Sequence, residues 1–357
     1  MKLRVSHFCL LVFNMAIKRR AFLYWCLLSC ISAAFVLKTD AGKKKEPGIV
    51  PESSLREYIK FFDFANGPIP EYEKRAAIVI MPGEGDKIRI GHNGIINEID
   101  ATATAAYIRK VLPEGSFTIS PISPWAQDMF KTTINKGTLE FVLSSKPPSF
   151  LVSTEEEIRE FINCIFNGHR IIKAPFSFEG GGIMFDRLNG KIYVFTDSTH
   201  KEHDVKAIFK ADKEINLPFA DIRIHLDEIL IFLGYRKVCI AYIVGNNLTE
   251  KEAKHFSNLN RMLSKSRKVL TSLGYSIVDI PVDYSDVRNG TTHLNCIQFK
   301  DRSNLSNIIV PHFENTNEEL FKQVIDIYRR EVDRVHPIRD ITAPFDGSLH
   351  CITNVIF

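Results

Sequence analysis

Four short stretches of the sequence combine the residue types that nucleophilic chemistry needs. They are Trp125-Ala126-Gln127-Asp128, Phe178-Glu179-Gly180-Gly181-Gly182, His225-Leu226-Asp227-Glu228 and His350-Cys351-Ile352-Thr353-Asn354. A cysteine attacks carbon only as the thiolate, and because a free thiol has a pKa of about 8.5, it needs a cationic neighbour. His225 or a cationic substrate could supply that charge to Cys351. The alternative for Cys351 is an ordinary buried cysteine of the core.

Residues 222–227 alternate apolar and polar side chains. If this stretch is extended, the two-residue period of a strand places His225 and Asp227 on one face. A carboxylate beside a histidine favours the imidazolium form and orients the ring. A polar strand face in contact with water is the alternative for this stretch taken alone.

Two further acids lie in predicted loops. Three consecutive glycines follow Glu179, and glycine permits positive φ and close approach of a ligand or of another backbone. Asp128 follows Trp125 in a stretch flanked by proline. Taken singly, a glycine loop can be only a hairpin, and such an aspartate only a turn or helix cap. Both acids are therefore candidates only in combination with the cysteine and the histidine.

Acids, a histidine and a cysteine together suit the hydrolysis of a guanidinium group. That cation is planar, always charged and rich in N–H donors arranged as a fork, so carboxylates that accept two N–H groups match it. Burying the cation unpaired would cost several kcal/mol, which is why more than one carboxylate is expected. Its carbon is then open to a thiolate that approaches from above the plane.

In order and type, the four motifs resemble those of the guanidino-group-modifying enzymes, the pentein-fold agmatine deiminases and peptidylarginine deiminases. Ile69-Pro70-Glu71-Tyr72-Glu73 and Leu294-Asn295 are similar to segments of the same enzymes, so the resemblance covers residues 68–357. It implies an α/β fold with a single catalytic domain, built as a β/α propeller with fivefold pseudo-symmetry and with the site on its axis.

The resemblance also implies how the chemistry is divided. Cys351 would be the nucleophile, and His225 the general acid and base that protonates the leaving ammonia and then activates water. Glu179 would orient His225 or the substrate. The covalent intermediate would be an S-alkylthiouronium, hydrolysed to a ureido product and ammonia. No cofactor and no metal are implied, and the sequence contains no EF-hand-type loop that would predict calcium dependence.

Substrate binding is implied for a second set of residues. Asp128 and Asp227 would grip the guanidinium nitrogens, with Trp125 and Asn295 completing the binding site. Agmatine deiminases usually have arginine where Gln127 stands and Gln-Gln in place of Asn354-Val355, which weakens an agmatine assignment. The expected partner is a guanidino small molecule or an arginine-containing peptide or protein.

Other functions stay open. An amidinotransferase would use the same thiouronium intermediate but pass the amidino group to an amine. A non-catalytic binding protein could use the same scaffold, although it would have no need of a Cys-His-acid set. A cysteine peptidase is disfavoured because its cysteine usually opens a helix, whereas Cys351 is expected on a terminal strand.

The N-terminus predicts export rather than fold. The chain has 357 residues, and Lys18-Arg19-Arg20 precedes an uncharged apolar run at 21–37, the pattern of a signal peptide or membrane anchor. We expect residues 1–45 to be this segment, which could attach the protein to a membrane, and residues 46–67 to be a linker. The expected location is secreted, periplasmic or membrane-anchored. The net charge of +4 includes no basic stripe, so no nucleic-acid partner is predicted.

The elements that must position the candidate residues alternate between strands and helices. The pattern predicts helices at 102–111, 155–166, 251–273 and 318–332. It predicts strands at 76–81, 116–120, 139–143, 170–175, 191–195, 238–244, 275–281, 293–299, 308–311 and 336–341. No composition break divides this region, so a single α/β domain is expected, with strand-strand-helix-strand units that recur loosely.

Overall fold

The computed structural model describes residues 66–356, except 82–86, 93–94, 101, 115, 120–125, 147–153, 167, 199, 201–202, 220–223, 246–247, 315, 340–348 and 352. The predicted signal or anchor segment and nearly all of the predicted linker lie outside this part of the chain. The last two residues of that linker, Asn66 and Gly67, form strand β1 and pair with β6. Within the described part, no helix is both long enough and apolar enough to cross a membrane.

The four predicted helices are present, with ends that differ from the prediction by one residue at most. They are α3 (Thr102–Val111), α5 (Glu155–Ile165), α7 (Glu250–Ser272) and α9 (Glu318–Glu331). Capping boxes begin two of them, because Thr154 and Thr249 accept backbone N–H groups while Glu157 and Glu252 bond back to the cap. Three short helices lie between strands: α4 (Ala126–Met129), α6 (Val205–Phe209) and α8 (Tyr284–Arg288).

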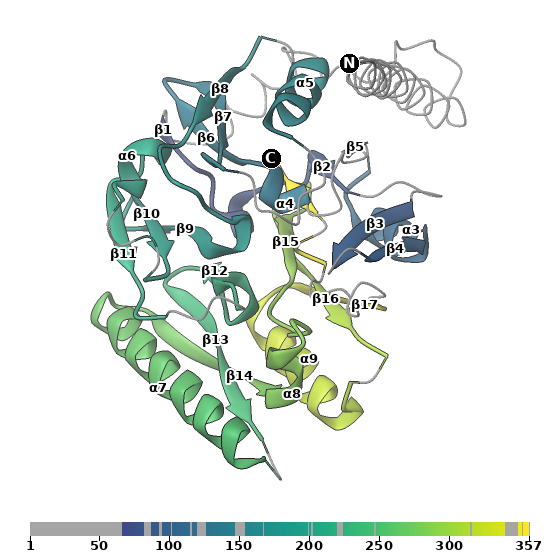
Figure 1. Ribbon diagram of the computed structural model, residues 1–357, viewed down its shortest axis with the longest axis vertical. Helices are drawn as coiled ribbons and strands as arrows, with labels where there is room; N and C mark the ends of the chain where they lie inside the picture. Colours follow the sequence, from purple (N-terminus) through teal and green to yellow (C-terminus); the bar gives the residue numbers. More distant parts are fainter. Residues whose placement is uncertain are drawn as a thin grey trace, which may run out of the picture.

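Five sheets of the described chain share one strand order, in which an antiparallel pair is joined by a parallel third strand. In four of these sheets the three strands follow one another in the chain. The four sets are β6 (Lys131–Asn135), β7 (Thr138–Leu143) and β8 (Arg170–Lys173); β9 (Ile183–Leu188), β10 (Lys191–Thr196) and β11 (Lys213–Asn216); β12 (Leu230–Gly234), β13 (Lys237–Val244) and β14 (Ser276–Asp283); β15 (Ile297–Lys300), β16 (Ser306–His312) and β17 (Arg334–Arg339). In each, a helix precedes the parallel strand, which is the strand-strand-helix-strand unit expected from the sequence. Figure 1 shows α5 and α7 at the periphery of the molecule.

The fifth sheet joins distant parts of the chain. It consists of β18 (Asn354–Val355), β2 (Ile78–Ile80) and β5 (Phe117–Ile119). Asn354 pairs with Ile80 and Val355 with Val79 in antiparallel register, so the segment after the candidate cysteine is bound to an early strand. A separate hairpin consists of β3 (Lys87–His92) and β4 (Ile95–Asp100).

Three stretches for which an extended conformation was predicted or considered contain turns, and each turn carries candidate site residues. Leu226–Glu228 is a 3-10 helix, closed by the Glu228 N–H donating to the His225 carbonyl at 3.2 Å. The predicted strand at 293–299 begins only at Ile297, because Asn295 N–H turns back to the Thr292 carbonyl at 3.2 Å. Cys351 lies in a turn before β18 rather than on a strand. Alternating polarity could not distinguish these buried turns from strands.

A buried aspartate fixes the 3-10 helix η1 (Glu71–Glu73) on strand β9. Asp186, which is 1% exposed, accepts a hydrogen bond from Tyr72 at 2.6 Å and another from the hydroxyl of Tyr275. Beside it, Arg187 and Glu73 form two N–H···O contacts of 3.0 Å. The hydrogen bond from Tyr72 to Asp186 matters for the site because Tyr72 is the immediate neighbour of Glu71 in η1.

Replacing Asp186 with alanine should therefore destabilise the protein. Two mostly buried tyrosine hydroxyls would lose their acceptor, and each unsatisfied group costs about 1–3 kcal/mol. We expect urea unfolding to report a loss of about 2–4 kcal/mol. Asp326→Ala on the exposed face of α9, where the aspartate forms a solvent-exposed ion pair with Arg329 at 3.3 Å, should change stability by less than about 0.5 kcal/mol. Equal effects of the two substitutions would contradict the bridging role of Asp186.

Candidate active site

The turn at Leu349–Cys351 is held from two sides. Asn295 has its Nδ2 atom 3.5 Å from the Cys351 Sγ atom, and its Oδ1 atom accepts the His350 backbone N–H at 3.0 Å. On the other side, the Gln127 backbone N–H donates to the Cys351 carbonyl at 3.3 Å. Cys351 is 7% exposed. The candidate nucleophile is thus fixed beside α4, which carries Asp128, and Figure 1 shows the C-terminus next to that helix.

His225 is surrounded by carboxylates. Its Nε2 atom is hydrogen-bonded to Glu179, as the predicted orienting role of Glu179 requires. Burial by itself would lower the pKa of His225, but the hydrogen bond that the ring donates to Glu179 and the charges of Glu228, Asp227 and Asp128 raise it to about 10. At neutral pH the ring is therefore an imidazolium and can give a proton.

The glycine triplet allows its loop to pack against both other clusters. Gly180–Gly182 form the 3-10 helix η2. A Cβ atom at Gly180 would lie 2.5 Å from the Gln127 carbonyl oxygen, and one at Gly181 would lie 2.8 Å from both Cβ and Nδ1 of His225. Both distances are too short for any side chain. The glycines are therefore required here for close approach, as the sequence suggested.

Asp128 is buried at the base of this loop. Its Oδ1 atom accepts the Gly180 N–H at 2.5 Å. Burial raises the pKa of Asp128 to about 6, against the lowering effects of the His225 charge and the Gly180 N–H. The carboxylate is thus partly protonated in mildly acidic solution and would gain from a bound cation.

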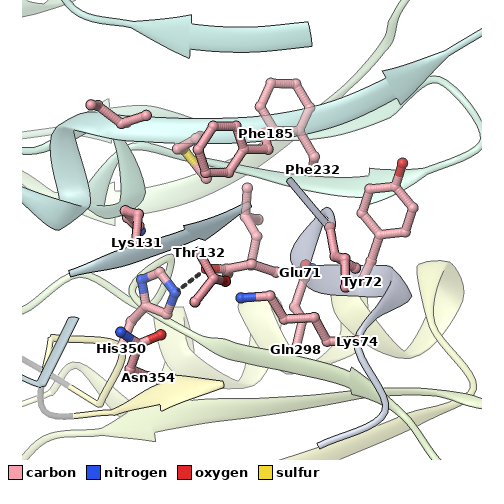
Figure 2. Close-up of a pocket in the computed structure, with 14 residues that line it drawn as sticks. Glu71, Tyr72, Lys74, Lys131, Thr132, Phe185, Phe232, Gln298, His350 and Asn354 are labelled. Carbon is pink, nitrogen blue, oxygen red and sulfur yellow. Dashed lines mark hydrogen bonds and ion pairs between the residues drawn. The ribbon is translucent and has the colours of Figure 1, made fainter. Parts of the chain in front are cut away.

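Asp227 contacts a histidine that the sequence analysis did not assign to the site. The Asp227 Oδ2 atom lies 2.7 Å from Nδ1 of His350, and Nε2 of the same ring lies 2.7 Å from Oε1 of Glu71. Figure 2 shows His350 beside Glu71 with this contact drawn. Burial would lower the pKa of His350, but the two carboxylates raise it to about 9. The ring is thus an imidazolium held between two acids.

Gln127 contacts both His350 and Asp227, and it completes a bridge that runs from Glu71 through His350 to Asp227. Because His350 is protonated, the amide oxygen of Gln127 faces its Nδ1 atom at 2.9 Å and also accepts from Lys131 Nζ at 3.2 Å. In that orientation the amide nitrogen donates to Asp227 Oδ2 at 3.1 Å. Asp227 is 2% exposed. Burial acts to raise its pKa, but the hydrogen bond and charge of His350 bring the pKa below its usual value.

The second carboxylate oxygen of Asp227 takes no part in the bridge to His350. Oδ1 is buried and has no hydrogen-bond partner among the described residues. It faces the glycine loop, since a Cβ at Gly181 would collide with it as well as with His225. An unpaired buried carboxylate oxygen is costly, so this atom is placed to accept an N–H group from a ligand.

A small cavity lies behind the bridge, on the side of Glu71. Polar residues Glu71, Lys74, Lys131 and His350 line it together with Phe185 and Phe232 (Figure 2). The Lys74 Nζ atom donates to the Val355 carbonyl at 2.5 Å, and burial lowers the pKa of Lys74 to about 8. Cys351, His225, Asp227 and Asp128 do not line this cavity, so it is separate from the predicted chemistry.

The structure brings six of the seven predicted site residues into one neighbourhood: Cys351, His225, Asp227, Asp128, Glu179 and Asn295. The seventh, Trp125, lies outside the described residues. Glu71, Gln127 and His350 were missed as site residues. All three stand inside motifs that carried the family resemblance, so the signal was present, but nothing in a single sequence indicates that Glu71 and His350 touch. In the described part of the chain, no three His, Cys, Asp or Glu side chains are grouped to hold a metal ion.

No protein-family model and no curated protein matches the sequence. Solved structures do match the fold. A putative arginine deiminase from Porphyromonas gingivalis has a TM-score of 0.59 at 14% identity, covering 81% of this chain and 97% of its own. An agmatine deiminase from C. jejuni with substrate bound has a TM-score of 0.56 at 15% identity, covering 81% and 95%. An amidinotransferase from Microseira wollei, of the saxitoxin biosynthetic pathway, has a TM-score of 0.52 at 14% identity, covering 82% and 97%.

These similarities confirm the predicted resemblance at the level of the fold. The chain has the mixed α/β fold that these two deiminases and this amidinotransferase share. The match extends over nearly the full length of each of these structures. Activity and substrate do not follow from identities this low and are argued from the site below.

Proposed function

We propose that this protein hydrolyses a guanidinium group to a ureido product and ammonia. The observation that carries the proposal is the set of acids around His225, in which Asp227 Oδ1 accepts from no described residue while Asn295 holds Cys351 in the same neighbourhood. A planar cation with several N–H donors would satisfy that oxygen and the buried Asp128 together. We further infer that the five similar sheet units are the blades of a propeller around this site.

The proposed reaction has two halves. In the first, the Cys351 thiolate bonds to the guanidinium carbon to give a tetrahedral adduct, His225 protonates the departing nitrogen, and the C–N bond breaks to release ammonia and leave an S-alkylthiouronium. In the second, His225 takes a proton from water, the hydroxide bonds to the same carbon, and the C–S bond breaks to restore the thiolate. Because the pKa of His225 is about 10, the resting site starts with the general acid already protonated. In the proposed reaction this positive charge favours the thiolate form of Cys351.

The substrate class remains a proposal within this reaction. The predicted export segment at residues 1–45 favours arginine in peptides or proteins, or an extracellular small guanidine. An amidinotransferase would differ in both halves, because the substrate's alkyl amine would leave in place of ammonia and an acceptor amine would replace water. The fold similarity to an amidinotransferase keeps that reaction as the second outcome of the test.

The test is release of ureido product and of ammonia by the full chain, offered agmatine, free arginine or an internal peptidyl-arginine. We expect turnover of one of them, and loss of at least about 1000-fold in kcat for Cys351→Ala because no nucleophile remains. Transfer of the amidino group to an added amine, without release of ammonia, would favour the transferase. No turnover by the intact chain, with or without an amine, would contradict the proposal.

A further inference from the structure

We propose that His350 is a positioning residue, which holds Asp227 by one carboxylate oxygen so that the other oxygen stays free for a guanidino group, and that Glu71 keeps His350 in place. This inference rests on the proposed function. It concerns residues one step removed from the reacting atoms, on the side of the site that faces the cavity of Figure 2.

The geometry of the bridge supports this role. His350 Nδ1–H and the Gln127 amide both donate to Asp227 Oδ2, at 2.7 and 3.1 Å, while Oδ1 accepts from no described residue. A carboxylate with one oxygen held by two donors cannot rotate without breaking both bonds. Its free oxygen is therefore fixed toward Gly181 and His225, which is the side where substrate must lie.

Glu71 stabilises the form of His350 that is protonated on both ring nitrogens. A neutral imidazole has only one N–H, and its second nitrogen would be an acceptor. Glu71 accepts from Nε2 at 2.7 Å, which requires a proton there while Nδ1 already donates to Asp227. The other charges packed nearby are Lys131, against Gln127, and Lys74, whose charges together with that of His350 lower the pKa of Glu71 to about 2 despite its burial.

The experiment compares Glu71→Gln with Glu73→Gln, two residues further along the same 3-10 helix. Glu73 contacts Arg187 on β9 and lies outside the site. With the substrate identified above, at about pH 8, we expect Glu71→Gln to raise KM by at least about tenfold and to change kcat less, because Asp227 binds substrate and transition state alike. Glu73→Gln should match the wild-type chain. Binding of methylguanidinium, measured by calorimetry on the Cys351→Ala chain, should weaken by the same factor when Glu71→Gln is added.

A second readout separates positioning from general loss of structure. Imidazole nitrogen shifts, recorded by NMR against pH, should show His350 protonated on both nitrogens at neutral pH. In Glu71→Gln the acid dissociation constant of His350 should rise by at least about tenfold, whereas Glu73→Gln should leave it unchanged.

The outcomes distinguish this inference from the proposed function. If the wild-type chain is active and Glu71→Gln leaves KM and the His350 titration unchanged, the inference is wrong and the deiminase proposal stands. If the wild-type chain turns over no guanidine, the deiminase proposal fails. The inference is then judged on methylguanidinium binding and on the titration, where a neutral His350 at pH 7, or binding that does not depend on Glu71, would overturn it.

Discussion

Gly181→Ala is expected to lower kcat/KM by at least about 100-fold while the protein stays folded. The added methyl group would lie 2.8 Å from Cβ and Nδ1 of His225 and would also collide with the free oxygen of Asp227. Either the loop or the imidazole must then move by a substantial fraction of an ångström. A misplacement of about 1 Å in a catalytic group can cost about 100-fold in rate.

The neighbouring glycine provides the control. A Cβ at Gly182 would lie 3.5 Å from Asp197 Oδ2 and 3.6 Å from His200 Cε1, which are ordinary contacts. We expect Gly182→Ala to keep kcat/KM within about threefold of wild type. Steady-state kinetics and a thermal melt of both variants give the comparison. If Gly181→Ala is as active as Gly182→Ala, then His225 and Asp227 do not need the positions described above.

Asp128→Asn is expected to reduce activity and increase stability at the same time. The asparagine can still accept the Gly180 N–H, but it brings no negative charge to a guanidinium nitrogen, so we expect kcat/KM to fall by at least about 100-fold. The pKa of Asp128 is about 6 in the fold and 3.8 in a model compound. Because of that difference, ionisation of Asp128 destabilises the folded protein by about 2–3 kcal/mol. The uncharged side chain of Asp128→Asn removes this cost.

The pH dependence of stability provides the check on Asp128. Because the pKa is raised in the folded state, the stability that Asp128 contributes is complete below about pH 4 and is lost as the pH rises through about 6. The stability advantage of Asp128→Asn over wild type should therefore be larger at about pH 8 than at about pH 4.5 in urea unfolding. An advantage that is the same at both pH values would show that Asp128 ionises as it does in water. A bound guanidinium should reduce the penalty, so substrate should stabilise wild type more at the higher pH.

Helices were more accurately predicted from the sequence than strands. Helices α5 and α7 begin at threonine caps with a glutamate three residues on, and α9 presents one apolar stripe, so local signals suffice. Strands such as β6, β9 and β12 were missed because each is only five or six residues long, although each pairs with the strand that follows it in the chain. An extended conformation was considered for residues 222–227 and a terminal strand was expected at Cys351, whereas Leu226–Glu228 and Leu349–Cys351 are turns. Their polarity alternates, but the hydrogen bonds that close them depend on tertiary contacts.

The site was predictable only as far as residue chemistry and resemblance could reach. Cysteine, histidine and acids indicate nucleophilic chemistry on a cation wherever they lie. The pairing of His350 with Glu71 spans 279 residues of sequence, and no periodicity relates positions so distant. The raised pKa of Asp128 likewise depends on burial, which is a property of the folded neighbourhood rather than of the loop sequence.

The pairing of β18 with β2 has a consequence for how the protein folds. The Lys74 side chain contacts the Val355 carbonyl across 281 residues, and the His350 contact to Glu71 is nearly as long in sequence. Contacts of this range impose a large loop-closure entropy and form late. The individual strand-strand-helix-strand units can form from local contacts, whereas the site exists only once the two ends of the domain have met. In a refolding experiment, recovery of helical circular dichroism should thus precede recovery of activity. The lag between the two signals would measure how long the two ends of the domain take to come together.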